Sequence, residues 1–133
     1  MTVARDPHAR FPRAARLLRR ADFERVYRGG KKHFTGNMTV FFLRREPSAG
    51  GPRAGLAVGR ALGGAVVRNR IRRRLREAVR LRLGELPLSV DFVLHPRKSV
   101  LQVDFARLSE EVGGAFAAIA AKLGAEKARS GGK

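Results

Sequence analysis

The sequence predicts a single α+β domain, and three observations predict this fold class. Apolar residues recur at helical spacing over residues 63–83 and again over residues 103–123. Residues 37–44 and 89–95 are instead rich in β-branched and aromatic side chains, as is typical of strands. A strand, a helix and a strand in this order make a βαβ unit. The length of 133 residues, 44% of them hydrophobic, suits one domain with a modest core.

The chain begins with a basic segment and a short helix. Residues 1–16 hold four arginines and two prolines without apolar periodicity, which predicts a flexible basic arm able to order on RNA. Residues 17–27 predict a helix with Asp22 as its N-cap, and Gly29-Gly30 ends it. The apolar face of this helix consists of Phe23, Val26 and Tyr27.

Three strands follow from the residue pattern. Residues 37–44 and 53–60 are consecutive strand segments, so we expect them to pair as a hairpin. Residues 89–95 form another strand, which Pro96 closes. The two strands that flank the helix at 63–83 are expected to be parallel neighbours. Helices then cover one face of the sheet, and the other face can stay open.

The helix at 63–83 is the most unusual element of the sequence. Eight arginines lie between Arg68 and Arg82, and Glu77 is the only acidic residue among them. Each pair of like charges spaced by four residues destabilises a helix by roughly a few tenths of a kcal/mol. A polyanion would relieve this repulsion, and the planar guanidinium suits phosphate. The competing interpretation is a basic face that is simply solvated. Four of these arginines are spaced by four residues and so form a column along one face of the helix: Arg68, Arg72, Arg76 and Arg80.

Charge and composition narrow the partners. The net charge is +18, from 29 basic against 11 acidic residues, so nucleic acid is the leading partner and an anionic membrane surface the second. Cysteine is absent, which excludes disulfides and thiolate metal sites. No apolar run approaches the roughly 20 residues of a membrane span, and no hydrophobic signal segment begins the chain. We therefore expect a soluble, cytoplasmic protein.

Catalytic motifs are scarce. The acidic residues are scattered, and His8, His33 and His95 lack companions at the spacing of metal ligands, so each is read as structural or solvated. Gly63-Gly64 precedes a helix without the lysine and hydroxyl residues of a phosphate-binding loop. The residues by themselves describe a binding protein without catalytic groups.

The motif from Gly63 to Arg73, with Leu75-Arg76-Glu77 after it, resembles the Arg-Asn-Arg signature helix of the bacterial ribonuclease P protein component. The resemblance covers roughly residues 17–123. It extends to Asp22-Phe23, Val26-Tyr27-Arg28, Gly30 and Val40-Phe41-Phe42.

The resemblance implies a two-layer, ribosomal-protein-like sandwich of order αβββαβα with a left-handed βαβ crossover. The domain would span residues 17–124, and residues 125–133 form a polar tail. The implied activity is that of ribonuclease P, an RNA-catalysed endonuclease that removes the 5′ leader from precursor tRNA. The catalytic RNA would hold the magnesium ions, so the polypeptide would have no catalytic residue and no cofactor. Its partners would be that RNA and precursor tRNA, with no membrane and no obligate protein partner.

The resemblance also assigns site residues. Three aromatic residues match the cleft that holds the single-stranded leader: Phe23, Tyr27 and Phe41. The competing interpretation of these rings is ordinary core packing. The residues expected to bind the RNA subunit are Arg60, Arg68, Asn69, Arg70, Arg72, Arg73 and Arg76.

Three other classes of protein compete with this interpretation. A ribosomal or other architectural RNA-binding protein needs the arginines but not the aromatic trio. A DNA-binding module normally mixes base-reading residues into its recognition helix. A stand-alone metal nuclease needs clustered carboxylates, which the sequence does not show.

Overall fold

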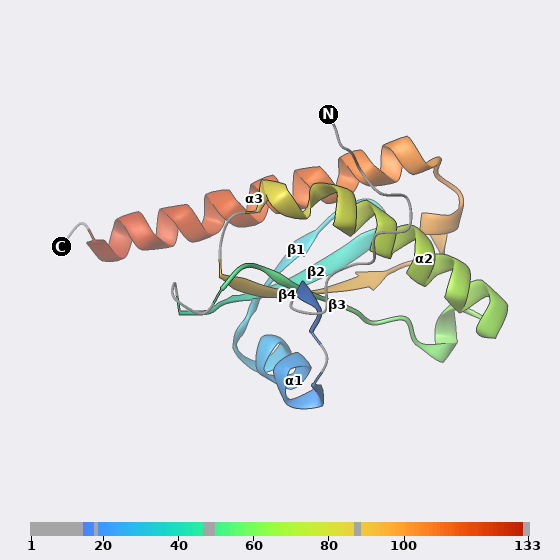
Figure 1. Cartoon of the computed structure of the whole chain (residues 1–133), viewed down its shortest axis with the longest axis horizontal. Helices are drawn as coiled ribbons and strands as arrows, with labels where there is room; N and C mark the ends of the chain where they lie inside the picture. The colour runs from blue at the N-terminus through green and yellow to red at the C-terminus, as the bar shows by residue number, and fades with distance from the viewer. Residues whose placement is uncertain (1–14, 18, 47–49, 87–88, 132–133) are drawn as a thin grey trace.

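The computed structural model describes residues 15–17, 19–46, 50–86 and 89–131. It confirms the α+β class and the order αβββαβα (Figure 1). The helices and strands are α1 (Arg20–Gly29), β1 (Lys31–Phe34), β2 (Met38–Arg44), β3 (Arg53–Leu56), α2 (Ala65–Arg82), β4 (Val90–Pro96) and α3 (Phe105–Gly131). Short 3-10 turns occupy Arg60–Leu62, Leu83–Glu85 and Lys98–Leu101.

The four strands form one mixed sheet in the order β1-β2-β4-β3. β4 pairs antiparallel with β2 and parallel with β3, so the expectation of parallel strands on either side of the basic helix is confirmed. The predicted hairpin between residues 37–44 and 53–60 is wrong, because β4 lies between these two strands. β4 is buried from Val90 to Leu94 on both of its faces, which suits it to the central position.

Two other strand predictions change. The strand predicted over residues 53–60 ends at Leu56, and a 3-10 turn starts at Arg60. β1 is the strand that the residue pattern alone missed, because its sequence Lys-Lys-His-Phe lacks apolar alternation. β1 is an edge strand, where charged side chains are tolerated.

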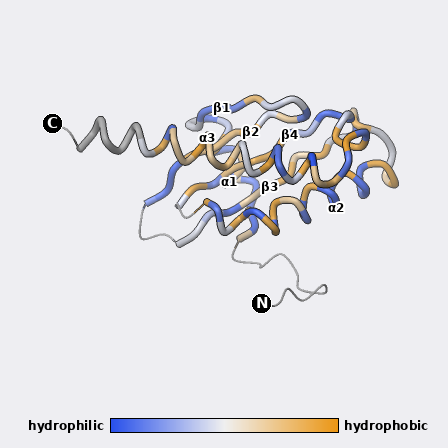
Figure 2. The backbone as a smooth tube through the Cα atoms, turned by 90° about the horizontal axis from the view of Figure 1, so that it is seen from above, coloured by the Kyte–Doolittle hydropathy of each residue, from blue (hydrophilic) through white to orange (hydrophobic). Residues whose placement is uncertain are grey.

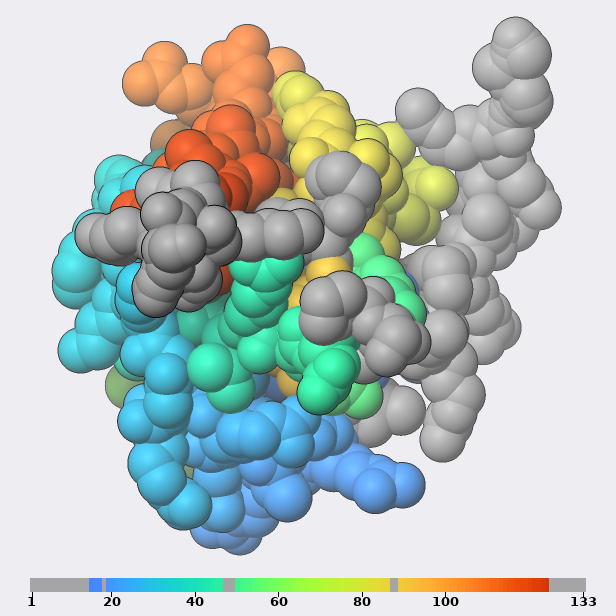
Figure 3. Space-filling model, turned by 90° about the vertical axis from the view of Figure 1, so that its left-hand side faces the viewer, coloured from blue at the N-terminus to red at the C-terminus, as the bar shows by residue number. Residues whose placement is uncertain are grey.

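The main core lies between the sheet and the helices α2 and α3. Figure 1 shows both helices on one side of the sheet, and Phe92 meets Phe116 edge to face with ring centroids 5.1 Å apart. α1 lies on the opposite side of the sheet (Figures 1 and 3). There Val26 packs with Val93 in a smaller cluster. The expectation of one wholly open sheet face is therefore corrected, because α1 covers part of it.

The start of α1 also differs from the prediction. The helix begins at Arg20, its N-cap is Arg19, and no side chain caps it. Asp22 instead lies in the first turn, where it accepts a hydrogen bond from Arg25 at 2.9 Å. Gly30 ends the helix as predicted, with its N–H donating to the carbonyl of Val26 at 2.8 Å. A Cβ atom on Gly30 would lie 2.5 Å from two carbonyl oxygens, so only glycine fits there.

The two ends of the predicted domain carry further structure. Ala15 is buried, and the N–H of Leu17 donates to the carbonyl of Ala54 at 2.9 Å, so the end of the predicted arm packs beside β3. The rest of that arm, residues 1–14, lies outside the described residues. α3 continues to Gly131, into the segment predicted as a polar tail. The left-handed crossover stays an expectation from the resemblance.

Candidate nucleic-acid interface

The buried face of α2 determines which of its arginines can reach a ligand. Ile71, Leu75, Ala78 and Val79 are fully buried against the core, so one side of the helix is fixed to the domain. Figure 2 shows the α2 tube changing repeatedly between hydrophilic and hydrophobic colours, as expected of an amphipathic helix. Some arginines of α2 therefore face solvent, and others make contacts within the protein.

The predicted RNA-binding residues lie on the outward side. Arg70, Arg73 and Arg76 are exposed, whereas Arg68 and Arg72 are half-buried. In the described part of the chain, no carboxylate lies within 4.0 Å of any of these five guanidinium groups. We name these five residues the arginine face.

Local contacts fix part of the arginine face. Arg68 donates through Nε to the carbonyl of Gly63 at 3.2 Å. Arg72 donates to the side-chain oxygen of Asn69 at 3.1 Å, so this asparagine orients one of the arginines. Arg60 is exposed in the 3-10 turn before the helix. Gly63 lies between this 3-10 turn and α2, and its φ of 139° favours glycine.

The other three arginines of the helix have partners within the protein. Arg80 donates to both carboxylate oxygens of Glu77, at 3.0 and 2.6 Å. Arg74 donates to the carbonyl of Val103, and Arg82 donates to the hydroxyl of Ser109 at 3.0 Å. Arg80 of the predicted column is therefore paired with a carboxylate of the same helix, whereas Arg68, Arg72 and Arg76 belong to the arginine face.

A second surface lies on the other face of the sheet, beside α1. The rings of Tyr27, Phe41 and His95 come from α1, β2 and β4, and their centroids are 4.8 to 5.2 Å apart. The Tyr27 hydroxyl is hydrogen-bonded to Nε2 of His95 at 2.8 Å. We name these three residues the aromatic cluster. Tyr27 is 40% exposed, so the cluster is open to a ligand.

Phe23, the third predicted leader residue, is half-buried, as Phe41 is. It packs with Leu17, Val26 and Val93 in the small core beneath α1. A Cβ atom on Gly55 would lie only 2.6 Å from the Phe23 ring, so the glycine in β3 makes room for this side chain. Phe41 packs against the same small core, so the assignment of Phe23 to the leader site stays a prediction.

His95 is the residue that sequence reasoning missed. A lone histidine near a strand end gives no sign of its neighbours, so the sequence alone predicts only a structural or solvated side chain. Burial lowers the pKa of His95 and raises the pKa of Tyr27, so both side chains are neutral at pH 7. A neutral pair shares the hydrogen bond without adding charge to the cluster.

The most buried carboxylate has a structural role. Asp91 is fully buried, and Arg53 donates to its two oxygens at 2.8 and 2.7 Å. Arg45 and Arg25 add bonds of 3.0 and 3.1 Å. The Asp91 carboxylate thus joins α1, β3 and β4 with the residue after β2, and both of its oxygens are fully engaged.

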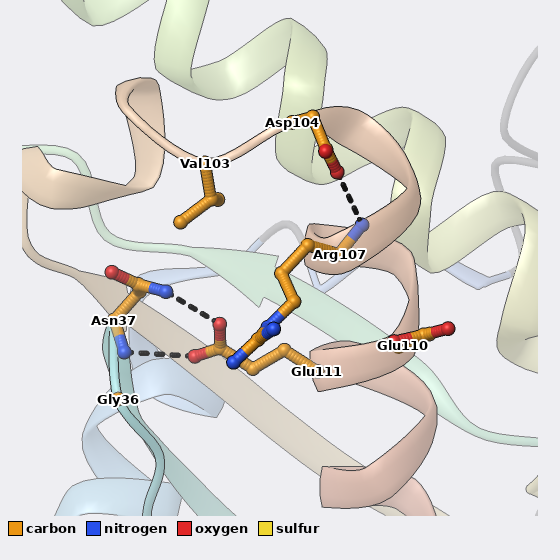
Figure 4. Close-up of a pocket in the computed structure, with 7 residues that line it drawn as sticks. All are labelled: Gly36, Asn37, Val103, Asp104, Arg107, Glu110 and Glu111. Carbon is orange, nitrogen blue, oxygen red and sulfur yellow. Dashed lines mark hydrogen bonds between the residues drawn. The ribbon is translucent and has the colours of Figure 1, made fainter.

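A pocket between the β1–β2 turn and α3 gathers three acidic residues (Figure 4). Glu111 accepts hydrogen bonds from the backbone and side chain of Asn37 at 2.8 and 2.6 Å, and from the Thr35 hydroxyl. Asp104 accepts the N–H of Arg107 at 2.9 Å and caps α3, while Glu110 points away from Glu111. Within the described residues, no group of three metal-ligating side chains is placed to hold an ion.

No helix in the described part of the chain is long and apolar enough to cross a membrane.

Comparisons with known proteins identify the family of the chain. The family model described as Ribonuclease P matches residues 11–120. The ribonuclease P protein component of Desulfovibrio desulfuricans is 40% identical over 103 residues, covering 76% of this chain and 79% of that protein. The component of Halorhodospira halophila is 45% identical over 100 residues, covering 74% and 80%.

A solved structure gives the same result for the fold. The RNase P protein from Thermotoga maritima superposes with a TM-score of 0.67 and 31% identity, covering 76% of this chain and 94% of that protein. The family match spans both the arginine face and the aromatic cluster. The chain therefore belongs to the ribonuclease P protein family and is a subunit of the endoribonuclease ribonucleoprotein that acts in tRNA processing.

Proposed function

We propose that the chain binds two different RNA elements on two separate surfaces. The arginine face, with Arg60 and Asn69 beside it, binds the catalytic RNA. The aromatic cluster binds the single-stranded 5′ leader of precursor tRNA. The observation that carries the proposal is the arginine face itself, whose guanidinium groups have no carboxylate partner among the described residues.

The arginine face suits a structured RNA. Its arginines repel one another in the free protein, and phosphate groups remove this repulsion by forming charge-assisted hydrogen bonds. Folded RNA is recognised largely by its shape and backbone, which guanidinium groups on a rigid helix can follow. Because the inner face of α2 is anchored in the core, these contacts cost little ordering of the protein.

The aromatic cluster suits an unpaired strand of varied sequence. Aromatic rings stack on any base and contribute about 1–3 kcal/mol per base. Lys32 adds a positive charge, with its Nζ 5.4 Å from the centroid of the Phe41 ring. An architectural RNA-binding protein would need the arginine face alone, so the exposed ring of Tyr27 favours leader recognition.

In this proposal the polypeptide supplies no reacting group. Bond cleavage and the magnesium ions belong to the RNA subunit, and the protein raises the affinity for the substrate and for those ions. The carboxylates of Asp91 and Glu111 are engaged in bonds within the fold, in keeping with this division. The particle would act in the cytoplasm and would need no other protein.

Reconstitution tests the proposal. The chain is combined with a bacterial ribonuclease P RNA, and cleavage of precursor tRNA is measured at low magnesium concentration. We expect the protein to enhance cleavage. A cognate RNA that gains nothing from the protein would contradict the proposed function.

A further inference from the structure

We infer that the leader site extends past the aromatic cluster to the edge strand β1. There Phe34 offers one more stacking surface and Lys32 a phosphate contact. The inference rests on the proposed leader site, and it adds a segment of the path that neither the sequence pattern nor the family resemblance assigned.

Strand pairing places these residues on the face that carries the aromatic cluster. Lys32 pairs with Phe41, Phe34 pairs with Thr39, and Thr39 pairs with His95. Residues that pair directly point to the same side of a sheet. The side chains of Lys32 and Phe34 therefore continue the surface that begins at Tyr27.

The alternate residues of β1 face the other way. His33 lies on the side of α3, where its Nδ1 is 3.4 Å from Nζ of Lys122. Lys31 shares that side, because it is two residues from His33 along the strand. The strand thus divides its residues between two faces, and this division supplies a control for any experiment on Lys32.

No packing among the described residues accounts for the exposure of Phe34. The side chain is 66% exposed and belongs to neither hydrophobic cluster. Strands lie about 4.8 Å apart, so β1 and β4 are separated by about 10 Å. This distance exceeds the roughly 3.4 Å between stacked bases. The surface from His95 to Phe34 therefore has room for more than one base.

The charge of this surface indicates which kind of ligand binds there. The strip formed by Lys32, Phe34, Thr39, Phe41 and His95 contains no acidic residue, and the whole chain carries +18. A second copy of the chain would bring the same charge to this strip. Single-stranded RNA combines negative phosphates with stacking bases, so it matches both the lysine and the rings.

The test uses the reconstituted particle and precursor tRNAs whose leaders are lengthened one nucleotide at a time. We expect the affinity of the particle for precursor tRNA to rise with leader length. Phe34→Ala should remove the last increase of this series, which we expect to be roughly fivefold. Affinity for the shortest leaders and for mature tRNA should stay unchanged. Phe34→Tyr should preserve the step, whereas Phe34→Leu should lose it.

Lysine variants separate a phosphate contact from general electrostatics. Lys32→Ala should flatten the dependence of log affinity on log salt by roughly one unit for long leaders. Lys31→Ala removes the same charge from the opposite face of β1 and should leave the leader-length profile unchanged. Equal effects of the two variants would overturn the assignment of Lys32.

The outcomes distinguish this inference from the proposed function. An unchanged length profile in Phe34→Ala, with Tyr27→Ala still weakening precursor binding, would overturn the extension alone. A wild-type profile without any dependence on the leader would overturn both. Sedimentation of the free protein tests the other occupant, because a dimer that Phe34→Ala dissociates would assign this face to self-association and overturn the inference.

Discussion

Asp91 shows how one buried carboxylate can stabilise the fold of a strongly basic chain. Its carboxylate is fully buried and accepts hydrogen bonds from Arg25, Arg45 and Arg53. A buried charge that loses its partner typically costs about 3–5 kcal/mol. Asp22 lies 2.9 Å from Arg25 and 3.8 Å from Arg53, so it offsets only part of the charge that the loss of Asp91 would leave uncompensated.

We predict that Asp91→Asn lowers the free energy of unfolding by about 3 kcal/mol or more. The measurement is denaturant unfolding of the free protein. Glu24→Gln is the matched control, because this exposed carboxylate pairs with Arg20 on the surface and should contribute less than about 1 kcal/mol. An Asp91→Asn protein as stable as the control would show that Arg25, Arg45 and Arg53 do not need the charge of Asp91.

Two histidines predict how stability depends on pH. Burial lowers the pKa of His95, and burial together with Lys122 lowers the pKa of His33, both from the ordinary value of 6.5. The unfolded chain therefore binds more protons than the folded chain as the pH falls below about 6.5. We predict that the free energy of unfolding decreases over this range.

Thermal unfolding from pH 8 to pH 5 checks the effect. In the double variant His33→Gln and His95→Gln, the part of the pH dependence due to these histidines should disappear. A wild-type and a double variant with identical pH dependence would contradict it.

At the residue scale, the sequence predicted two of the three residues of the aromatic cluster. Tyr27 and Phe41 match the family's positions, and they do meet in space. Phe23 shares the same helical face and packs above Gly55 against the small core beneath α1. His95 could not be found, because its role depends on the alignment of β4 beside β2, which a single strand pattern does not give.

At the scale of elements, α2 shows two neighbouring arginines with opposite roles. Arg73 is exposed on the arginine face, whereas Arg74 donates to the carbonyl of Val103 and its Nε is buried. Helical geometry turns successive residues by about 100°, so adjacent arginines need not share a face.

We predict that Arg73→Ala weakens binding to the catalytic RNA and reduces the salt slope by about one, without changing stability. Arg74→Ala should instead lower the free energy of unfolding by about 1–3 kcal/mol, because the Val103 carbonyl loses its donor. Filter binding at several salt concentrations and denaturant unfolding measure the two effects. The prediction fails if the variants exchange these effects or share them equally.

Element boundaries followed from the sequence better than strand pairing did. Apolar periodicity located α2 and the start of α3 within two residues, because burial of one face imposes the pattern. The hairpin between β2 and β3 was wrong because neighbouring strands in sequence need not pair. Only the continuous burial of β4 places it in the centre, and burial is a property of the folded chain.

At the scale of the whole molecule, a net charge of +18 opposes the compact state. The arginine face concentrates part of this charge on one side of one helix. An anion that binds the folded protein in preference to the unfolded chain must therefore stabilise it.

We predict that sulfate or polyphosphate raises the Tm of the free protein. An anion at 100 times its Kd adds about 2.7 kcal/mol to the free energy of unfolding. Sodium chloride at matched ionic strength is the control for general screening. A melting curve that responds equally to both salts would argue against a preformed anion site.

The separation of the two RNA surfaces is tested most directly by binding of precursor and mature tRNA to the reconstituted particle. Tyr27→Ala should weaken binding of precursor tRNA, by roughly fivefold or more, and leave mature tRNA unchanged, because only the precursor carries a leader. Equal losses for both RNAs would mean that the Tyr27 ring is ordinary core and that the aromatic cluster is not a leader site.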